Sequence, residues 1–311
     1  MIKKTLAFSN PAYLSLKNRQ LVIRMPEVEK ANVSDSLKSD AVRTIPIEDI
    51  GVVVLENKQI TITNALLEAL LENNCAVVTC NSSMMPAGLL LPLYSHTVQS
   101  QRFTCQISAS APLKKQLWQQ TIQCKITNQA RVLSKATETD ASVMLKWAER
   151  VQSGDVANME ARAAAFYWKN LFPNIKGFTR EQDGDAPNNL LNYGYAILRA
   201  VIARSLVGSG MLPTFGIHHH NRYNAFCLAD DIMEPYRPFV DQIVLEIFNS
   251  GVDCSTLTTD LKRKLLAIPA IDVTINGSKS PLMIAATTTT SSLFKCFNGE
   301  SRKIIYPTIT S

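Results

Sequence analysis

Residues 83–94 read Ser-Met-Met-Pro-Ala-Gly-Leu-Leu-Leu-Pro-Leu-Tyr, and the pattern of the chain changes across them. Pro86, Gly88 and Pro92 interrupt this apolar stretch, and residues of this kind are typical of a connection between regular elements. Short runs rich in valine and isoleucine come before the stretch, whereas long helical patterns come after it. The stretch therefore predicts a boundary near residue 85 between two parts of different structural class.

The part before the boundary is predicted to be a small β-rich domain. Its strand-like runs, identified by their β-branched and apolar residues, cover residues 5–8, 13–17, 20–24, 44–56, 59–62 and 76–80. One helix is expected over Ala65–Leu71, and the polar residues 27–42 are expected to form a loop. We assign residues 1–84 to this domain and residues 85–96 to a linker.

The part after the boundary is predicted to be a larger, all-α domain over residues 97–311. Helical periodicity covers residues 114–136, 141–151, 158–171, 188–207, 229–250 and 257–267. The polar run Thr287–Ser292 is expected to be a helix cap or a loop. Pro235 lies inside one predicted helix and removes a backbone hydrogen bond, which predicts a kink beside Glu234. The predicted fold class is thus α+β and multidomain.

Composition excludes several classes of protein. The chain is 46% hydrophobic and 19% charged, which excludes a mainly disordered protein. No apolar run reaches the ~18–20 residues of a membrane span, so no membrane contact is expected. Seven cysteines without a Cys-x-x-Cys pair are typical of thiols in a reducing cytoplasm.

The net charge of +6 lies entirely in the second part of the chain. Residues 1–85 hold nine Lys and Arg against nine Asp and Glu, whereas residues 86–311 hold 23 against 17. A polyanionic partner for the second part is consistent with this distribution.

Histidines and carboxylates of the second part could hold a divalent cation. His218, His219 and His220 are consecutive, and Asp231 and Glu234 follow at a helical i, i+3 spacing that puts both carboxylates on one face. A loop histidine facing helical carboxylates is an N/O ligand set suited to Mg²⁺ or Mn²⁺. From the residues alone, a polar loop beside a solvated helix face remains the alternative.

A further carboxylate, Glu160, opens the helix expected over residues 158–171. Its neighbours on the same helical face include alanines, which leave room for a cation and a bulky substrate. Asp155 or Asn158 is expected to cap the helix. The alternative role for Glu160 is to stabilise the helix dipole from the first turn.

Basic side chains in this part could contact DNA phosphates. The predicted DNA-binding residues are Arg162, Lys169, Arg180, Arg222 and Arg237. The alternatives are solvated faces and, for Arg237, an ion pair with Glu234 three residues earlier.

Together these segments resemble the signatures of the CRISPR adaptation integrases, metal-dependent endonucleases that insert new spacers into CRISPR arrays. The matching segments are Gly154-Asp155-x-x-Asn158-x-Glu160, Gly216-Ile217-His218-His219, Leu228-Ala229-x-Asp231-x-Met233-Glu234-Pro235-x-Arg237-Pro238, Lys125-Ile126-x-Asn128-Gln129 and Asn188-x-Leu190-Leu191-Asn192-Tyr193-Gly194-Tyr195. The Met-Glu-Pro-Tyr-Arg-Pro form is most similar to type II systems.

The resemblance implies a β-rich domain for dimerisation or partner contact, followed by a helical catalytic domain that binds DNA. It implies Glu160, His219 and Glu234 as catalytic residues and ligands of Mg²⁺ or Mn²⁺, with Asp231 as a nearby supporting group or occasional ligand. The Gly-x-x-His spacing indicates His219, while His218 and His220 remain alternatives.

The activity implied is transesterification, in which the 3′-hydroxyl of a captured DNA fragment attacks the CRISPR repeat. The implied partners are double-stranded DNA, a second copy of the chain, a small protein of the adaptation complex and the type II RNA-guided effector nuclease. Two other functions remain open, a non-catalytic DNA-binding scaffold and a plain metal-dependent DNA nuclease.

Overall fold

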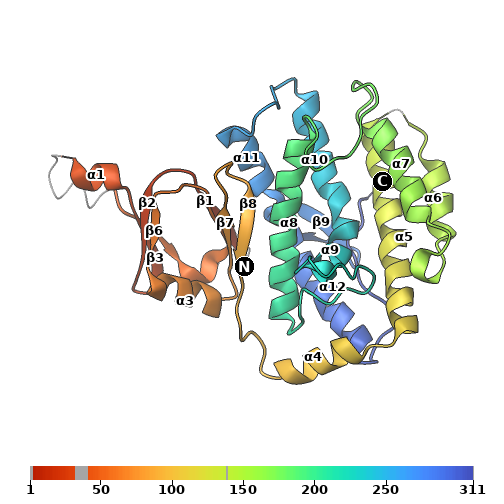
Figure 1. The fold of residues 1–311 in the computed structure, drawn as a ribbon, viewed down its shortest axis with the longest axis horizontal. Coiled ribbons are helices and arrows are strands. Elements are labelled where there is room, and N and C mark those ends of the chain that lie inside the picture. Colours follow the sequence, from red (N-terminus) through yellow and green to blue (C-terminus); the bar gives the residue numbers. More distant parts are fainter. Residues whose placement is uncertain (1–2, 32–40, 138, 311) are drawn as a thin grey trace. The chain divides into compact units, whose positions relative to one another are not determined.

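The computed structural model describes residues 3–31, 41–137 and 139–310. The chain forms two compact units, Met1–Ser95 and His96–Ser311 (Figure 1). The first unit is rich in strands and the second is mostly helical, so the fold class expected from the sequence is confirmed.

The first unit contains two four-stranded sheets. One sheet has the order β1 (Lys4–Phe8), β5 (Ile50–Leu55), β7 (Ala76–Cys80), β8 (Pro86–Leu90), parallel except for the antiparallel edge strand β8. The other has the order β4 (Arg43–Pro46), β3 (Gln20–Arg24), β2 (Ala12–Lys17), β6 (Ile60–Ile62), in which only β2 and β6 are parallel.

Both sheets and helix α3 (Asn64–Glu72) share one apolar core. Leu14 of β2, Val53 of β5 and Leu66 and Leu70 of α3 meet in it. Strand β5 reads Ile-Gly-Val-Val-Val-Leu and is buried along nearly its whole length, as a central strand of a parallel sheet requires.

Three details of the first unit differ from the prediction. The run 44–56 is two strands of different sheets, because Pro46 ends β4 and a short 3₁₀ helix η1 (Ile47–Asp49) turns the chain. Residues 86–90, assigned to the linker, form β8; Pro86 is tolerated because it begins an edge strand. In the segment 27–42, a short helix α1 (Pro26–Lys30) forms, and residues 32–40 lie outside the described residues.

The second unit is built around two long helices (Figure 1). Helix α5 packs against α6, α7, α9 and α10, and α8 packs against α9, α10, α11 and α12. The helices are α4 (Gln99–Ser108), α5 (Ala111–Ala136), α6 (Ser142–Glu149), α7 (Met159–Leu171), α8 (Asn188–Gly208), α9 (Cys227–Met233), α10 (Arg237–Asn249), α11 (Thr259–Leu266) and α12 (Leu282–Phe297), with short 3₁₀ helices η2 (Ser153–Asp155), η3 (Glu234–Tyr236) and η4 (Ile268–Ala270).

The kink predicted at Pro235 is confirmed. Helix α9 ends at Met233, η3 follows, and α10 begins at Arg237. The carbonyl of Asp231 accepts the N–H of Glu234 instead of that of residue 235, since proline has none. The chain therefore turns at the residue that carries the Glu234 carboxylate.

The second unit is not all-α, because strands β9 (Asp272–Ile275) and β10 (Ser278–Pro281) form an antiparallel hairpin. Its turn is Asn276-Gly277, with φ values of 50° and 75°, a strong hairpin signal that the sequence already carries. The run Thr287–Ser292 is neither cap nor loop but lies inside α12. Burial of its hydroxyl groups is tolerated because they form hydrogen bonds. For example, the hydroxyl of Thr289 donates to the carbonyl of Ile305 at 2.7 Å.

Helix α8 is long and apolar enough to cross a membrane, although no such segment was expected from the sequence. In the structure, 83% of its most apolar 18-residue stretch is buried, as in the central helix of a helical domain. Its apolar character is therefore explained by packing against four other helices.

Candidate active site

Two carboxylates from separate elements converge on one lysine. The Nζ of Lys125 in α5 lies 2.6 Å from Glu160 Oε1 of α7 and 2.6 Å from Glu234 Oε2 of η3. The two carboxylate oxygens are thus within twice that distance of each other. The side chains of Lys125, Glu160 and Glu234 are 11%, 25% and 7% exposed, so the cluster is largely buried but reachable beside Glu160.

The turn before α7 positions Glu160. Gly154, Asp155 and Asn158 have φ values of 76°, 50° and 51°, a region that Gly, Asp and Asn tolerate better than other residues. The two carboxylate oxygens of Asp155 accept the N–H groups of Met159 and Glu160, both at 2.9 Å. Asn158 occupies the N-cap position, but the Asp155 side chain caps the first N–H groups of α7, and the Gly-Asp-x-x-Asn-x-Glu spacing follows from this backbone path.

Glu234 is held by two cations. Arg237 Nε lies 2.9 Å from Glu234 Oε1, so the ion pair considered from the sequence is present. Burial alone would raise the pKa of Glu234, but Arg237 and Lys125 more than offset it and lower that pKa. Burial alone would lower the pKa of Lys125, but the carboxylates of Glu234 and Glu160 raise it above its ordinary value. Both groups are therefore charged at neutral pH.

Asp231 organises the histidine loop. Its carboxylate is fully buried and accepts the backbone N–H groups of His218 at 2.9 Å and of His219 at 3.3 Å. It also lies 2.5 Å from Nδ1 of His219, and this hydrogen bond is the main cause of the raised pKa of His219. Because Asp231 takes Nδ1, Nε2 is the ring nitrogen of His219 left for another ligand.

The three histidines have different surroundings. His218 stacks on Trp118, with ring centroids 4.1 Å apart and planes at 1°, and burial lowers its pKa. His219 contacts the edge of the same ring at 5.6 Å. His220 is exposed. Of the three, His219 is the one whose ring is oriented by a buried carboxylate.

Gly216 is required by the close approach of this loop to α9. A Cβ at this position would lie 2.4 Å from the carbonyl oxygen of His219 and 2.7 Å from Asp231 Oδ2. We expect Gly216→Ala to lower the free energy of unfolding by about 1–3 kcal/mol. Urea unfolding measures this effect. A wild-type free energy of unfolding would contradict this role of Gly216.

Glu160, Glu234 and His219 provide the oxygen and nitrogen donors of a cation site, but their side chains are not grouped around one point. No three His, Cys, Asp or Glu side chains in the described part of the chain are grouped closely enough to hold a metal. Glu160 and Glu234 face Lys125, whereas His219 is bound to Asp231. Glu234 Oε2 is buried, and the ammonium group of Lys125 lies 2.6 Å from it. Two carboxylates and an imidazole fit Mg²⁺ or Mn²⁺.

The predicted DNA-binding residues fall into two groups. Arg162, Lys169 and Arg222 are exposed. Arg180 instead donates to the side chains of Asn188 and Asn192 at 3.1 and 2.6 Å, and Arg237 is paired with Glu234. Arg180 and Arg237 are thus engaged in contacts within the second unit, and both are partly exposed.

Lys125 was missed as a site residue, although the sequence carries a signal for it. Trp118, Ile122, Lys125 and Gln129 follow one another at i+3 and i+4 spacings in α5, and all are buried. A lysine on the buried face of a helix requires a charged partner. The sequence could have identified that requirement, but it could not have identified Glu160 and Glu234 as the partners.

Behind the cluster, a buried carboxyl group binds two tyrosines. Asp241 accepts the hydroxyl hydrogens of Tyr195 at 2.5 Å and Tyr167 at 2.9 Å. Burial raises the pKa of Asp241 to about 7, even though these hydrogen bonds and Arg237 act to lower it. The guanidinium of Arg237 lies over the ring of Tyr195, with Cζ 4.7 Å from its centroid.

The raised pKa of Asp241 predicts a pH-dependent stability. The pKa of an aspartate in the unfolded chain is ~3.9, whereas that of Asp241 in the folded chain is about 7. Between these two pH values, the folded chain holds a proton on Asp241 that the unfolded chain has lost. The free energy of unfolding should therefore fall as pH rises through this window, by at most about 1.4 kcal/mol per pH unit. We expect Asp241→Asn to remove that contribution. Urea unfolding at several pH values tests this, and parallel profiles for variant and wild type would contradict it.

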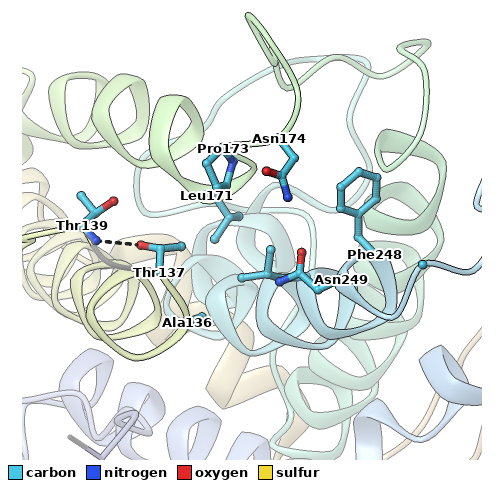
Figure 2. Close-up of a pocket in the computed structure, with 10 residues that line it drawn as sticks. Ala136, Thr137, Thr139, Leu171, Pro173, Asn174, Phe248 and Asn249 are labelled. Carbon is cyan, nitrogen blue, oxygen red and sulfur yellow. Dashed lines mark hydrogen bonds between the residues drawn. The ribbon is translucent and has the colours of Figure 1, made fainter.

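A pocket elsewhere in the second unit is not the candidate site. It lies where α5, α7 and α10 end, and Figure 2 shows Leu171, Asn174 and Phe248 among its lining residues. Among the described residues that line it, none is charged and none is a predicted site residue.

Comparisons with known proteins identify relatives over most of the chain. Residues 6–266 match the family model described as "CRISPR associated protein Cas1". The CRISPR-associated endonuclease Cas1 of Neisseria meningitidis serogroup C (strain 8013) is 39% identical over 267 residues, covering 86% of this chain and 83% of that protein.

Two solved structures share the fold. A casposase bound to an integration product has a TM-score of 0.77 at 18% identity, covering 97% of this chain and 92% of that one. A Cas6-RT-Cas1–Cas2 complex has a TM-score of 0.74 at 17% identity, covering 99% of this chain and 36% of that one.

Proposed function

The chain belongs to the CRISPR-associated Cas1 family, and on that premise we propose that Glu160, Glu234 and His219 hold the divalent cation with which it acts on DNA. It is an endonuclease and integrase of CRISPR spacer acquisition, in a family that is generally metal-dependent. The observation that carries the proposed site is the convergence of Glu160 and Glu234, from separate elements, on one Nζ at 2.6 Å.

When bound, Mg²⁺ or Mn²⁺ would neutralise charge developing on a phosphoryl oxygen and align the attacking hydroxyl group. Glu160 and Glu234 supply the negative charge that attracts the cation. Asp231 keeps the imidazole of His219 in one orientation and holds the backbone of its loop. No protein nucleophile is needed for this chemistry.

The proposed reaction is a transesterification. The 3′-hydroxyl of a captured DNA fragment attacks a phosphodiester of the CRISPR repeat, and one P–O bond forms as another breaks. The number of phosphodiester bonds is conserved, so the step requires no ATP. Membership of the Cas1 family supports this reaction, and the likeness to a casposase solved with its integration product is consistent with it.

The proposed substrate is double-stranded DNA, contacted through exposed cations such as Arg162, Lys169 and Arg222. A Cas2-type small protein is the proposed partner, because a similar chain occurs with Cas2 in a solved complex. We further propose a homodimer formed through the β-rich unit, contact with the type II RNA-guided effector nuclease, and a cytoplasmic location.

A branched DNA that mimics a half-integrated fragment tests the reaction with the purified chain alone. The DNA is incubated with Mn²⁺, with Mg²⁺ and with EDTA, using the wild type and Glu160→Ala. Glu149→Ala, which alters an exposed glutamate of α6, is the matched control. We expect release of the fragment coupled to rejoining of the target strand, lost in EDTA and in Glu160→Ala but kept in Glu149→Ala.

Other products distinguish the alternative functions. Cutting without rejoining would indicate a plain nuclease. Absence of any product, with tight DNA binding by the wild type and by Glu160→Ala, would favour a non-catalytic scaffold and reject the proposed site.

A further inference from the structure

We infer that Lys125 competes with the divalent cation for Glu160 and Glu234, so that its ammonium group withdraws when the cation binds. The inference rests on the proposed function, because it takes the two glutamates as ligands. It adds to that function a residue whose position decides when the ligands are available.

The position of the ammonium group is the first argument. Nζ lies 2.6 Å from one oxygen of each glutamate. A Mg²⁺ ion bound to the same two oxygens would lie about 2.0–2.1 Å from each. Two cations sharing the same pair of oxygens would be separated by only a few ångströms in a largely buried cluster, where like charges repel strongly. The lysine and the metal therefore exclude each other.

The charge of the cluster is the second argument. The carboxylates of Glu160 and Glu234 are balanced by Lys125 and by Arg237, which is 2.9 Å from Glu234. Four formal charges cancel, so a divalent cation approaching the intact cluster meets no net negative charge. Withdrawal of the ammonium group restores a net charge of −1 beside the incoming cation.

The flexibility of the two cations is the third argument. Arg237 is restrained by the ring of Tyr195, with Cζ 4.7 Å from its centroid. Lys125 has a flexible four-carbon stem, and its ammonium group can move while α5 stays in place. Lys125 is thus the cation that moves. In the absence of metal it also keeps two partly buried carboxylates together that would otherwise repel each other.

Mn²⁺ binding by the full chain tests the competition. The wild type, Lys125→Met and Lys125→Arg are stripped with EDTA, dialysed and titrated with Mn²⁺, and free Mn²⁺ is measured by electron paramagnetic resonance. We expect Lys125→Met, which removes the charge at similar volume, to bind Mn²⁺ at least about 10-fold more tightly, because a like charge no longer competes in a largely buried cluster. Lys125→Arg, which keeps a cation, should show no such gain.

Thermal unfolding provides a second readout on the same samples. Lys125→Met should unfold at a lower temperature than the wild type in EDTA, because its carboxylates repel, and should gain more from added Mn²⁺. Equal or weaker Mn²⁺ binding by Lys125→Met, beside a wild type that binds, would overturn the inference and leave the proposed function in place. If neither protein binds Mn²⁺, the inference and the proposed function are both contradicted.

A measurement on the wild type keeps the inference testable even if Lys125→Met does not fold. Reductive methylation, read by peptide mass spectrometry, reports whether each lysine is accessible. Lys125 should be modified several-fold more in Mg²⁺ than in EDTA, whereas Lys135, an exposed lysine of the same helix, should not change. Equal modification of Lys125 in the two conditions would contradict its withdrawal.

Discussion

Replacement of Glu234 by glutamine is expected to lower the rate of metal-dependent DNA strand transfer by more than about 100-fold, since even residues that only support metal ligands cost up to that factor. The side chain keeps its size but loses its charge, which leaves Lys125 and Arg237 without one of their anionic partners. Glu234 and Glu160 are the two anions facing Lys125, and loss of either leaves one carboxylate to hold a divalent cation. A branched-DNA strand-transfer assay in Mn²⁺ measures the rate.

Glu246→Gln is the matched control for this experiment. Glu246 is an exposed glutamate of α10, the helix that follows the kink at Pro235, and its carboxylate accepts a hydrogen bond from Gln242 at 3.0 Å. The same chemical change there should leave the rate within a factor of about two, as is usual for a surface substitution that does not alter stability. Equal rates for Glu234→Gln and Glu246→Gln would remove Glu234 from the ligand set.

Replacement of Asn128 by leucine is expected to have the largest effect on stability. Asn128 is fully buried and donates to the carbonyls of Pro235 at 2.9 Å and Pro307 at 3.1 Å. Its own oxygen accepts the N–H of Ile309 at 3.0 Å. Leucine leaves three buried backbone groups without these partners, at about 1–3 kcal/mol each, so the free energy of unfolding should fall by at least about 3 kcal/mol.

Urea unfolding measures this loss, and Gln116→Leu, at an exposed position of the same helix, controls for adding an apolar residue to α5. The control should change stability by less than about 0.5 kcal/mol. If the two variants were equally stable, the three hydrogen bonds of Asn128 would contribute little to the fold. A large loss would show that α5 stabilises both the kink beside Glu234 and the C-terminal segment.

Much of the fold could be predicted from the sequence because its signals are local. Strand β5 is a continuous apolar run, α5 and α8 have helical periodicity, and the change of pattern near residue 85 separates two classes of structure. The kink at Pro235 was predictable for the same reason, since a proline lacks the donor that a helix needs. The β9–β10 hairpin was missed although Asn276-Gly277 is a local hairpin signal.

Other elements depended on contacts that local patterns do not specify. The apolar residues 86–90 resemble a connector, and only pairing with β7 makes them a strand. The polar run Thr287–Ser292 resembles a loop, and only hydrogen bonds such as that from Thr289 to Ile305 allow it to be buried in α12. In both cases the deciding partner is supplied by another element.

For the candidate site, the residues present and their local presentation could be predicted from the sequence. The types and spacing of Gly154, Asp155 and Asn158 specify the turn that begins α7 at Glu160, and Pro235 specifies the bend that carries Glu234. The meeting of these two carboxylates, the position of Lys125 between them and the contact of Asp231 with His219 instead depend on how the helices pack. Backbone preferences act over a few residues, whereas charges separated by tens of residues interact only after the helices have packed.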